Sequence, residues 1–158
     1  MSTTDTHFLQ KTITLAAENV RTGNGGPFAA IITKNNEIIA EGTNTVTLTN
    51  DPTAHAEITA IRKACEALNS YQLEGCTLYS SCEPCPMCLG AIYWSRLERL
   101  VFAADKHQAE KAGFDDAFIY KEIILPHNQR HLKTEQISLQ EDNKPFNLWL
   151  NSDTKVEY

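Results

Sequence analysis

The sequence predicts an α/β fold in three layers, α/β/α, built on a mixed sheet of about five strands. Two short apolar segments flank the dipeptide Asn35-Asn36, a pattern that is typical of a β-hairpin. After this hairpin, helical and strand patterns alternate along the chain, and such alternation favours a layered sheet with helices on both faces. The length of 158 residues suits one domain, residues 1–158, with a full-sized core.

Each element is expected from its local pattern. The first helix, over residues 7–22, follows from apolar side chains at helical spacing, and a glycine-rich turn at 23–27 follows it. The later elements are expected in this order: strands at 28–33 and 37–41, a polar loop from Gly42, a helix at 52–68, a strand at 76–81, a helix at 86–95, a strand at 99–104, a short helix at 106–112, a mixed segment at 113–124, a strand at 133–139 and a helix at 144–151.

Composition narrows the classes of function. The formal net charge is −6, from 14 Lys and Arg against 20 Asp and Glu, and no basic run is present to meet phosphates. A small-molecule substrate is therefore favoured over RNA or DNA. No apolar run approaches the roughly 18 residues that a membrane span needs, and the N-terminus lacks the pattern of a signal peptide. Five cysteines, an odd number, fit reduced thiols, so we expect a cytoplasmic protein.

The strongest functional signal is His55-Ala56-Glu57 followed by Cys85-Pro86-Met87-Cys88. One imidazole and two thiolates can hold a zinc ion and leave its fourth position open, as catalytic zinc sites do. Zinc lowers the pKa of a bound water to about 7, and a carboxylate beside it can exchange protons with the reacting groups. Zinc nucleobase deaminases carry this signature, with the glutamate as general acid/base. We therefore predict a hydrolytic enzyme with one Zn²⁺ per subunit, held by His55, Cys85 and Cys88, and Glu57 as its acid/base.

Helix-start signals help to place these residues. Asp51-Pro52 is typical of an N-cap followed by proline at the first helical position, so a helix is expected to begin there. Side chains two residues apart on a helix point about 200° apart, and His55 and Glu57 can therefore converge only at a site off the helix N-terminus. Cys85 and Cys88 share one face of the next helix, and a helix N-terminus favours thiolates.

Other interpretations stay open for the individual motifs. A single Cys-x-x-Cys can be a redox pair or half of a structural zinc site, and a zinc-stabilised binding module without catalysis would carry the same ligands. Cys82 adds a third cysteine at the same spacing, so Cys82 and Cys85 could form the metal pair instead. We favour Cys85 and Cys88 because the Pro-Cys-x-x-Cys form starts at Pro84 and places both on the helix. Cys82 is then expected at the end of a strand, near the site but off the metal.

With these motifs the chain resembles the cytidine-deaminase-like superfamily and, within it, the bacterial guanine deaminases. The narrower resemblance rests on these segments: Gly25-Gly26-Pro27-Phe28, Asn50 to Glu57, Leu89 to Trp94, Gly113 to Glu122 and Val156-Glu157-Tyr158. It runs from about the first helix to the last residue and is weakest over 1–6 and 125–145. Ala29 departs from the glycine that the resemblance leads us to expect there, which would tighten the pocket wall slightly.

The resemblance implies hydrolysis of guanine to xanthine and ammonia, in purine catabolism or salvage. In that interpretation Glu57 takes a proton from water and helps to protonate the departing nitrogen. Asp116 is expected to meet the amino side of guanine and to relay a proton. Three side chains are expected to bind the base: Asn44 by a hydrogen bond to its edge, Phe28 by stacking on the ring and Trp94 by walling the pocket.

The resemblance also implies a homodimer and a small purine base as the partner, with neither nucleic acid nor membrane. The C-terminal segment, about 140–158, is expected to cross to the partner subunit, where Tyr158 would close the site as a lid. A tRNA adenosine deaminase is the nearest alternative because it shares the zinc motif and Asn44. It should need a cationic surface and a basic C-terminal helix, which the sequence does not show. Cytosine deaminase is a second alternative.

Overall fold

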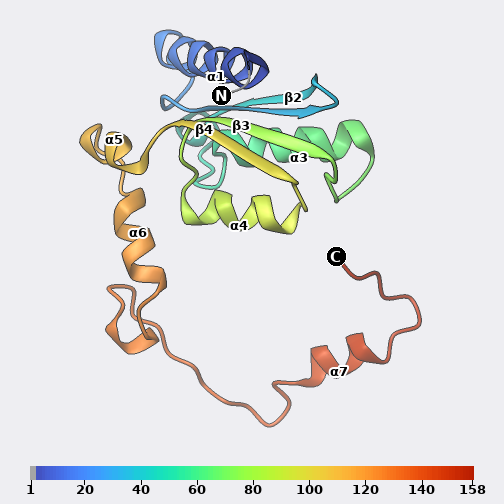
Figure 1. The fold of residues 1–158 in the computed structure, drawn as a ribbon. Coiled ribbons are helices and arrows are strands. Elements are labelled where there is room, and N and C mark those ends of the chain that lie inside the picture. The colour runs from blue at the N-terminus through green and yellow to red at the C-terminus, as the bar shows by residue number, and fades with distance from the viewer. Residues whose placement is uncertain (1–2) are drawn as a thin grey trace. The chain divides into compact units, whose positions relative to one another are not determined.

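The computed structural model describes residues 3–158, which form two units (Figure 1). The first unit runs to Tyr120 and contains the β-sheet, and the second consists of Lys121–Tyr158. The prediction of one domain over residues 1–158 stays a prediction, and the two units are described separately below.

The first unit is built on a mixed sheet with the strand order β2-β1-β3-β4. β1 is antiparallel to both β2 and β3, and β3 is parallel to β4. The predicted hairpin turn is formed by Asn35 and Asn36, whose φ angles of 51° and 65° are the left-handed values that a two-residue turn requires. The strands are β1 Ala29–Lys34, β2 Glu37–Thr43, β3 Cys76–Cys82 and β4 Arg99–Ala104. The mixed sheet is confirmed, with four strands rather than about five among the residues described.

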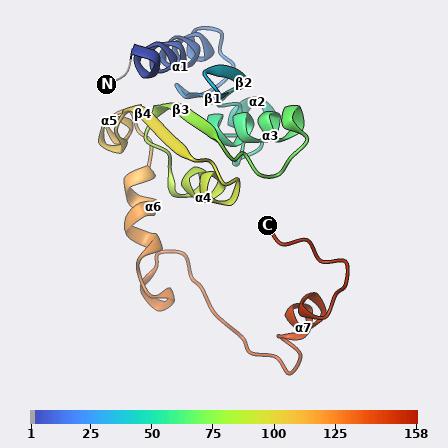
Figure 2. The same cartoon turned by 45° about the vertical axis from the view of Figure 1, so that its right-hand side comes forward.

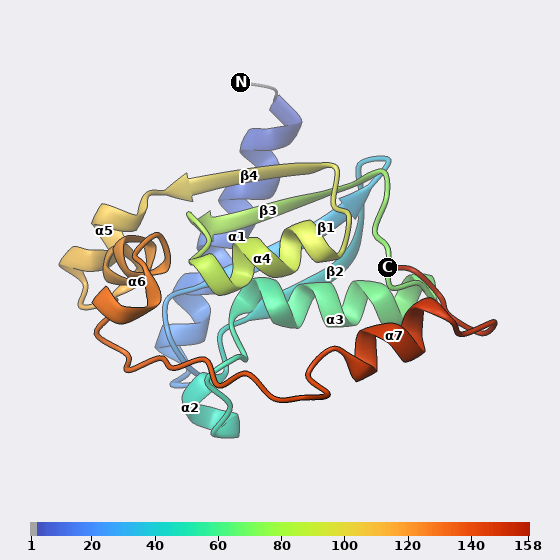
Figure 3. The same cartoon turned by 90° about the horizontal axis from the view of Figure 1, so that it is seen from below.

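Helices cover both faces of this sheet. α1, Thr3–Arg21, lies on one face, and α3, Ala56–Leu68, and α4, Pro86–Trp94, lie on the other (Figures 1 and 2). Figure 3, drawn from the side of α3 and α4, shows these two helices side by side across the strands. The predicted α/β/α layering is therefore confirmed.

The side chains of the central strand β3 pack against helices on both faces of the sheet. Successive side chains of a strand point to opposite faces. Leu78 is fully buried in the cluster that α3 covers, whereas its neighbour Tyr79 packs against Phe8 and Leu9 of α1. Because helices cover both faces, β3 is buried along almost its whole length, and a polar side chain on it needs an internal partner.

The helix α3 lies close against β2 because small residues line their contact. A Cβ atom at Gly42 would lie 2.5 Å from the backbone nitrogen of Ala60, and closer still to the carbonyl oxygen of Ala56. Glycine is required at this close approach. The facing alanines of α3, at 56, 60 and 64, are fully buried. This contact fixes the position of the N-terminal end of α3, which carries the first zinc motif, against the sheet.

The helix after Asp51 begins later than predicted, at Ala56. Asp51 does not cap it, because its Oδ1 accepts hydrogen bonds from the backbone N–H and the hydroxyl of Thr53 at 2.8 and 2.7 Å. These bonds close an Asx turn, which competes with capping for the same oxygen. His55 takes the N-cap position instead. A separate short helix that was not predicted, α2, Val46–Thr49, precedes this turn.

After β4 the chain forms two short helices, α5, Lys106–Lys111, and α6, Asp116–Ile123. α5 begins with a complete capping box. The Asp105 carboxylate accepts from the Gln108 backbone N–H at 2.8 Å, and the Gln108 side chain accepts from the Asp105 N–H at 3.0 Å. The predicted short helix near 106–112 is therefore present, and the mixed segment after it contains α6.

Besides the C-terminal end of α6, the second unit contains a 3-10 turn, His127–Gln129, and the helix α7, Lys144–Leu150. The strand predicted at 133–139 is wrong for the described chain, because this segment pairs with none of the four strands and a strand needs such a partner for its backbone groups. Large apolar side chains of this unit are exposed: Ile124, Leu132, Ile137, Leu139, Phe146, Leu148, Trp149, Leu150, Val156 and Tyr158. None of the helices within residues 3–158 combines the length and apolar character that crossing a bilayer would need.

Candidate active site

The zinc-motif residues lie at the N-terminal ends of two helices. His55 is the N-cap of α3, with φ −69° and ψ 159°, and Cys85 is the N-cap of α4, with φ −66° and ψ 167°. Pro86 follows Cys85 at the first helical position, where its missing N–H costs nothing. Both side chains therefore leave the backbone just before a helix begins. The expectation that the site lies off the helix N-termini agrees with this geometry.

Three donor atoms converge at this point. Nδ1 of His55 lies 3.6 Å from Sγ of Cys85 and 3.5 Å from Sγ of Cys88, and the three ligand atoms all lie within 4.8 Å of one another. With Zn–S bonds of about 2.3 Å and Zn–N bonds of about 2.0–2.1 Å, a tetrahedral ion needs sulfur and nitrogen about 3.6 Å apart. The donor set and its spacing therefore fit a zinc ion held by three protein ligands.

Cys82 is not part of this group, although the sequence leaves it as an alternative ligand. It is the last residue of β3, and its Sγ donates to the carbonyl oxygen of Asp105 at 3.7 Å. Among the residues that the structure describes, the group that could hold a metal ion consists of His55, Cys85 and Cys88. The geometry thus favours the cysteine pair on α4.

The site favours a thiolate at Cys85. A hydrogen bond from the Cys88 thiol lowers the pKa of Cys85 to about 4, and a further hydrogen bond from His55 acts in the same direction. The same pairing with Cys85 raises the pKa of Cys88 and of the His55 imidazole. A thiolate is the form of cysteine that binds a metal, so the lowered pKa of Cys85 is consistent with its assignment as a ligand.

Glu57 lies in the first turn of α3 and is almost completely buried. Burial raises the pKa of its carboxyl group, because the charged form loses its hydration. Its Oε1 accepts a hydrogen bond from the hydroxyl of Ser80 on β3 at 3.2 Å. A carboxyl group with a raised pKa beside a metal site can both accept and return a proton, which is what an acid/base catalyst must do.

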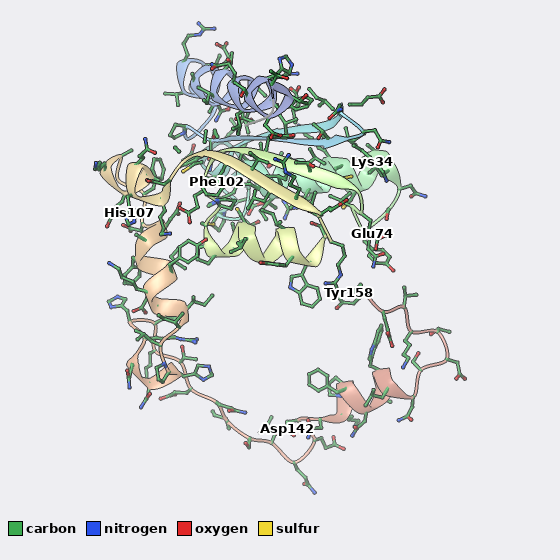
Figure 4. The ribbon with its side chains drawn as sticks, viewed as in Figure 1. Lys34, Glu74, Phe102, His107, Asp142 and Tyr158 are labelled. Atoms are coloured by element: carbon green, nitrogen blue, oxygen red, sulfur yellow. The ribbon has the colours of Figure 1, made fainter. Side chains whose placement is uncertain are left out.

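A cavity of about 260 Å³ opens beside this group. In Figure 4, the C-terminal end of β3, which leads to Cys85, and that of β4, which leads to α5, lie towards His107, whereas Lys34 lies at the opposite end of the sheet. Small-molecule cavities usually measure roughly 300–1,000 Å³, so this one suits a small ligand. Its walls are Gly26, Phe28, Asn44, Val46, Thr47, His55, Glu57, Glu83, Cys85, Phe114 and Asp116.

Asn44 is held rigidly at the edge of this cavity. Its Oδ1 accepts from the backbone N–H groups of Val46 and Gly26 at 3.3 and 3.4 Å, which leaves Nδ2 as the side-chain atom that can donate to a ligand. Asn19 of α1 donates to the carbonyl oxygens of Asn44 and Gly26 at 2.9 and 2.8 Å. Sequence reasoning missed Asn19, although a polar residue three positions after Ala16 on the apolar stripe of α1 is an available signal.

Two aromatic rings close one side of the cavity. The rings of Phe28 and Phe114 meet edge to face, with centroids 4.7 Å apart and an interplanar angle of 79°, a favourable aromatic geometry. Asp116 lines the same cavity from the first residue of α6. Burial raises the pKa of Asp116, and the negative charge of Cys85 adds to that shift. Phe114 was not predicted as a site residue, although it lies in the segment that supports the family resemblance.

A small network ties this wall to the metal-binding loop. Lys106 forms an ion pair with Glu83 at 2.9 Å and lies 5.1 Å from the ring centroid of Tyr120. The hydroxyl of Tyr120 donates to the carbonyl oxygen of Pro84 at 2.8 Å. Although burial raises the pKa of Glu83, the hydrogen bonds and charge of Lys106 outweigh it and lower the pKa overall. α5 and α6 are thereby held to the loop that precedes Cys85.

The last two predicted base-binding residues are Trp94 and Tyr158. Trp94 is the last residue of α4, 62% exposed, with Arg96 lying 6.0 Å from its ring. α4 runs away from the metal group after Cys88, so the prediction that Trp94 walls the pocket is not supported within one chain. Tyr158 belongs to the second unit, and its role as a lid stays a prediction.

Comparisons with known proteins agree with the geometry of the site. Residues 2–104 match the family model described as the cytidine and deoxycytidylate deaminase zinc-binding region. Guanine deaminase from Bacillus subtilis (strain 168) is 57% identical over 151 residues, which cover 96% of this chain and 97% of that protein. The X-ray structure of guanine deaminase from Bacillus subtilis matches with a TM-score of 0.95 at 55% identity, over 100% of this chain and 99% of that one. A tRNA-specific adenosine deaminase from Aquifex aeolicus (strain VF5) is 51% identical over 78 residues, 49% of this chain and 52% of that protein.

Proposed function

The chain belongs to the cytidine and deoxycytidylate deaminase family of zinc-binding domains, and from this membership we propose that it is a guanine deaminase, which hydrolyses guanine to xanthine and ammonia. The observation that carries the proposal is the match to a guanine deaminase over almost the whole chain, including α6 and the C-terminal segment. The cavity of about 260 Å³, with its buried acid/base, suits a free purine base.

His55, Cys85 and Cys88 would hold the zinc ion, one per subunit, and the 3.5–3.6 Å spacing of their donor atoms supports this assignment. When bound, zinc supplies Lewis acidity that makes a water molecule nucleophilic near neutral pH. The protein's own part is to keep that water and the base together in a small cavity, which converts an encounter in solution into a reaction between positioned groups.

Glu57 moves the protons of the reaction. It accepts one proton from the attacking water and delivers one to the departing nitrogen, so that guanine and water give xanthine and ammonia in balance. Its buried position, which raises its pKa, suits both directions of transfer. Asp116, which lines the same cavity, would meet the amino side of guanine and relay a proton, and its raised pKa supports that role.

The base would be held by two further side chains. Phe28, whose ring packs edge to face against Phe114, would stack on the purine ring. Nδ2 of Asn44 would donate to an acceptor on the purine edge, since the Oδ1 of Asn44 already accepts two backbone hydrogen bonds. A preorganised donor of this kind discriminates against bases without the matching acceptor, because its hydrogen bond would then be lost.

We further propose a homodimer in which the segment at about 140–158 lies on the partner subunit and Tyr158 closes the partner's site. The support is the surface of the second unit, where Phe146, Trp149 and Tyr158 are exposed. Exposed apolar surface of this kind marks an interaction site. A cytoplasmic location and a place in purine catabolism or salvage stay predictions.

An assay with free guanine tests the proposed activity. Purified protein should release xanthine and ammonia in equal amounts, measured by chromatography and by a coupled ammonia assay, and Glu57→Gln should release almost none. Adenine, cytosine and an adenosine-containing tRNA stem-loop serve as comparisons for the alternative deaminases. A wild-type protein that leaves guanine unchanged and deaminates one of these instead would overturn the proposal.

A further inference from the structure

Two adjacent serines on β3 have different partners. Ser81 accepts a hydrogen bond from the backbone N–H of Ala29 at 3.0 Å. This bond holds the first residue of β1, so the Ser81 hydroxyl has a structural role. Ser80 instead donates to Oε1 of Glu57 at 3.2 Å. Only one of these two buried hydroxyls therefore contacts the acid/base of the proposed reaction.

The surroundings of Ser80 would otherwise favour an apolar residue. Its side chain is 2% exposed, and it points to the same sheet face as Leu78, which belongs to the apolar core. Ala30 lies beside it on β1. A hydroxyl buried at such a position is unfavourable unless it has hydrogen-bond partners, and Glu57 accepts the proton of this one.

A backbone hydrogen bond orients the Ser80 hydroxyl. The backbone N–H of Cys82 donates to Oγ of Ser80 at 3.4 Å, which engages the oxygen as an acceptor and leaves its proton for Glu57. An ionised carboxylate can only accept hydrogen bonds, so the pairing is complementary. It holds Oε1 of Glu57 against β3.

We propose that Ser80 is a positioning residue that holds the Glu57 carboxylate in the orientation needed for proton transfer, a role that rests on the deaminase function proposed above. A glutamate side chain has three rotatable torsions, and a fixed donor on the sheet removes part of that freedom before substrate binds. Misplacing an acid/base by about 1 Å can cost about 100-fold in rate. Ser80 is not among the residues that line the cavity or that form the metal group, so its effect on the reaction passes through Glu57.

The test compares Ser80→Ala, Ser80→Thr and the matched control Ser81→Ala, with kcat, KM, zinc content and melting temperature measured for each. Ser80→Ala should lower kcat about 10- to 100-fold, the same range as the loss of a partner that orients a metal ligand, with KM changed by less than about threefold. Ser80→Thr, which keeps the hydroxyl, should recover most of kcat. Ser81→Ala should change kcat little. All variants should bind as much zinc as the wild type.

A double variant separates positioning from a general structural effect. In the Glu57→Gln background, Ser80→Ala should lower the residual rate by no more than about twofold, because coupled residues are not additive. An equal loss in both backgrounds, or a kcat of Ser80→Ala equal to that of Ser81→Ala, would overturn the inference.

The Ser80 and Ser81 variants are assayed on whichever base the wild type deaminates. The test of the positioning role is then independent of the test of guanine as the substrate. A kcat loss in Ser80→Ala on another base supports the positioning role and overturns guanine as the substrate. A wild type that deaminates guanine with no loss in Ser80→Ala overturns the positioning role alone. A wild type that deaminates no base overturns both.

Discussion

Nδ1 of His55 lies 3.6 Å from Sγ of Cys85, although 30 residues separate them in the chain. The two residues occupy the same position on different helices, the N-cap, one on α3 and one on α4. This equivalence lets two helix N-termini face one point, where their partial positive charges favour anionic groups. A zinc site with thiolate ligands, an acid/base and a substrate cavity can therefore share that point.

Zinc content should depend on Cys85 and not on Cys82. Cys85→Ser removes one of three converging donors, so bound zinc should fall from the wild-type content to almost none, measured by elemental analysis of the purified protein. Cys82→Ser is the matched control, because the Sγ of Cys82 bonds a backbone oxygen rather than facing the metal group. Loss of zinc from Cys82→Ser with retention in Cys85→Ser would reverse the ligand assignment.

Glu57→Gln should keep its zinc and lose its turnover. Glutamine preserves the size of the side chain and lacks the ability to take a proton, so the rate with guanine should fall about 100- to 10,000-fold, the range usual for general acid–base catalysis. Glu66→Gln, at an exposed position of the same helix, is the control and should be indistinguishable from the wild type. Unchanged turnover in Glu57→Gln would favour a binding module whose zinc is structural.

Asn44→Ala should weaken substrate recognition while the metal group stays intact. Loss of one donor to the purine edge should lower kcat/KM with guanine about 10- to 100-fold, with zinc content unchanged. Asn24→Ala serves as the control, because Asn24 is an exposed asparagine that donates to Thr22 and does not line the cavity. A kcat/KM equal to that of the control would exclude Asn44 from base binding.

A mixing experiment tests whether Tyr158 closes the partner's site. Deletion of Lys155 to Tyr158 should lower turnover with zinc content and melting temperature nearly unchanged, because the segment is largely exposed in one chain. Co-expression of this deletion variant with full-length Glu57→Gln should restore activity, because the mixed dimer holds one intact site and one intact lid in trans. Mixed dimers are identified by two affinity tags. If they show no restored activity, Tyr158 either closes the site of its own subunit or does not act as a lid.

Stability should fall at high pH because of Cys82. Burial raises the pKa of its thiol to about 11 from an ordinary value of 9.0, and the charges of Asp116 and Glu57 add to the shift. Between these two pH values the native state keeps a proton that the unfolded chain releases, so the free energy of unfolding decreases as pH rises from 9 to 11. Burial of Cys65 and Cys76 acts in the same direction.

Denaturant unfolding at pH 8, 9, 10 and 11 measures this slope. Cys82→Ala should show a shallower decrease than the wild type, since it lacks one of the titrating thiols. Equal slopes for the two proteins would mean that the Cys82 thiol titrates alike in the folded and unfolded states.

Much of the chemistry could be read from the sequence because its signals are local. The spacings of His55 with Glu57 and of Cys85 with Cys88 lie within single helix starts, and zinc chemistry requires those residue types whatever surrounds them. The layered α/β/α fold could be predicted for the same reason, since the hairpin at Asn35-Asn36 and the periodic patterns are properties of short segments. The errors fall where a local signal had two outcomes, as at Asp51, whose carboxylate closes a turn instead of capping a helix.

The tertiary structure alone decided how these groups act together. Nδ1 is the ring nitrogen of His55 that meets the thiols, Ser80 contacts Glu57 across 23 residues, and Asn19 holds Asn44 across 25. No periodicity or motif specifies such contacts, because each depends on how α1, β3 and α3 pack on the sheet. The sequence by itself determined which reaction groups the protein carries, whereas packing determined their orientation, since long-range contacts are set by the whole core rather than by neighbours in the chain.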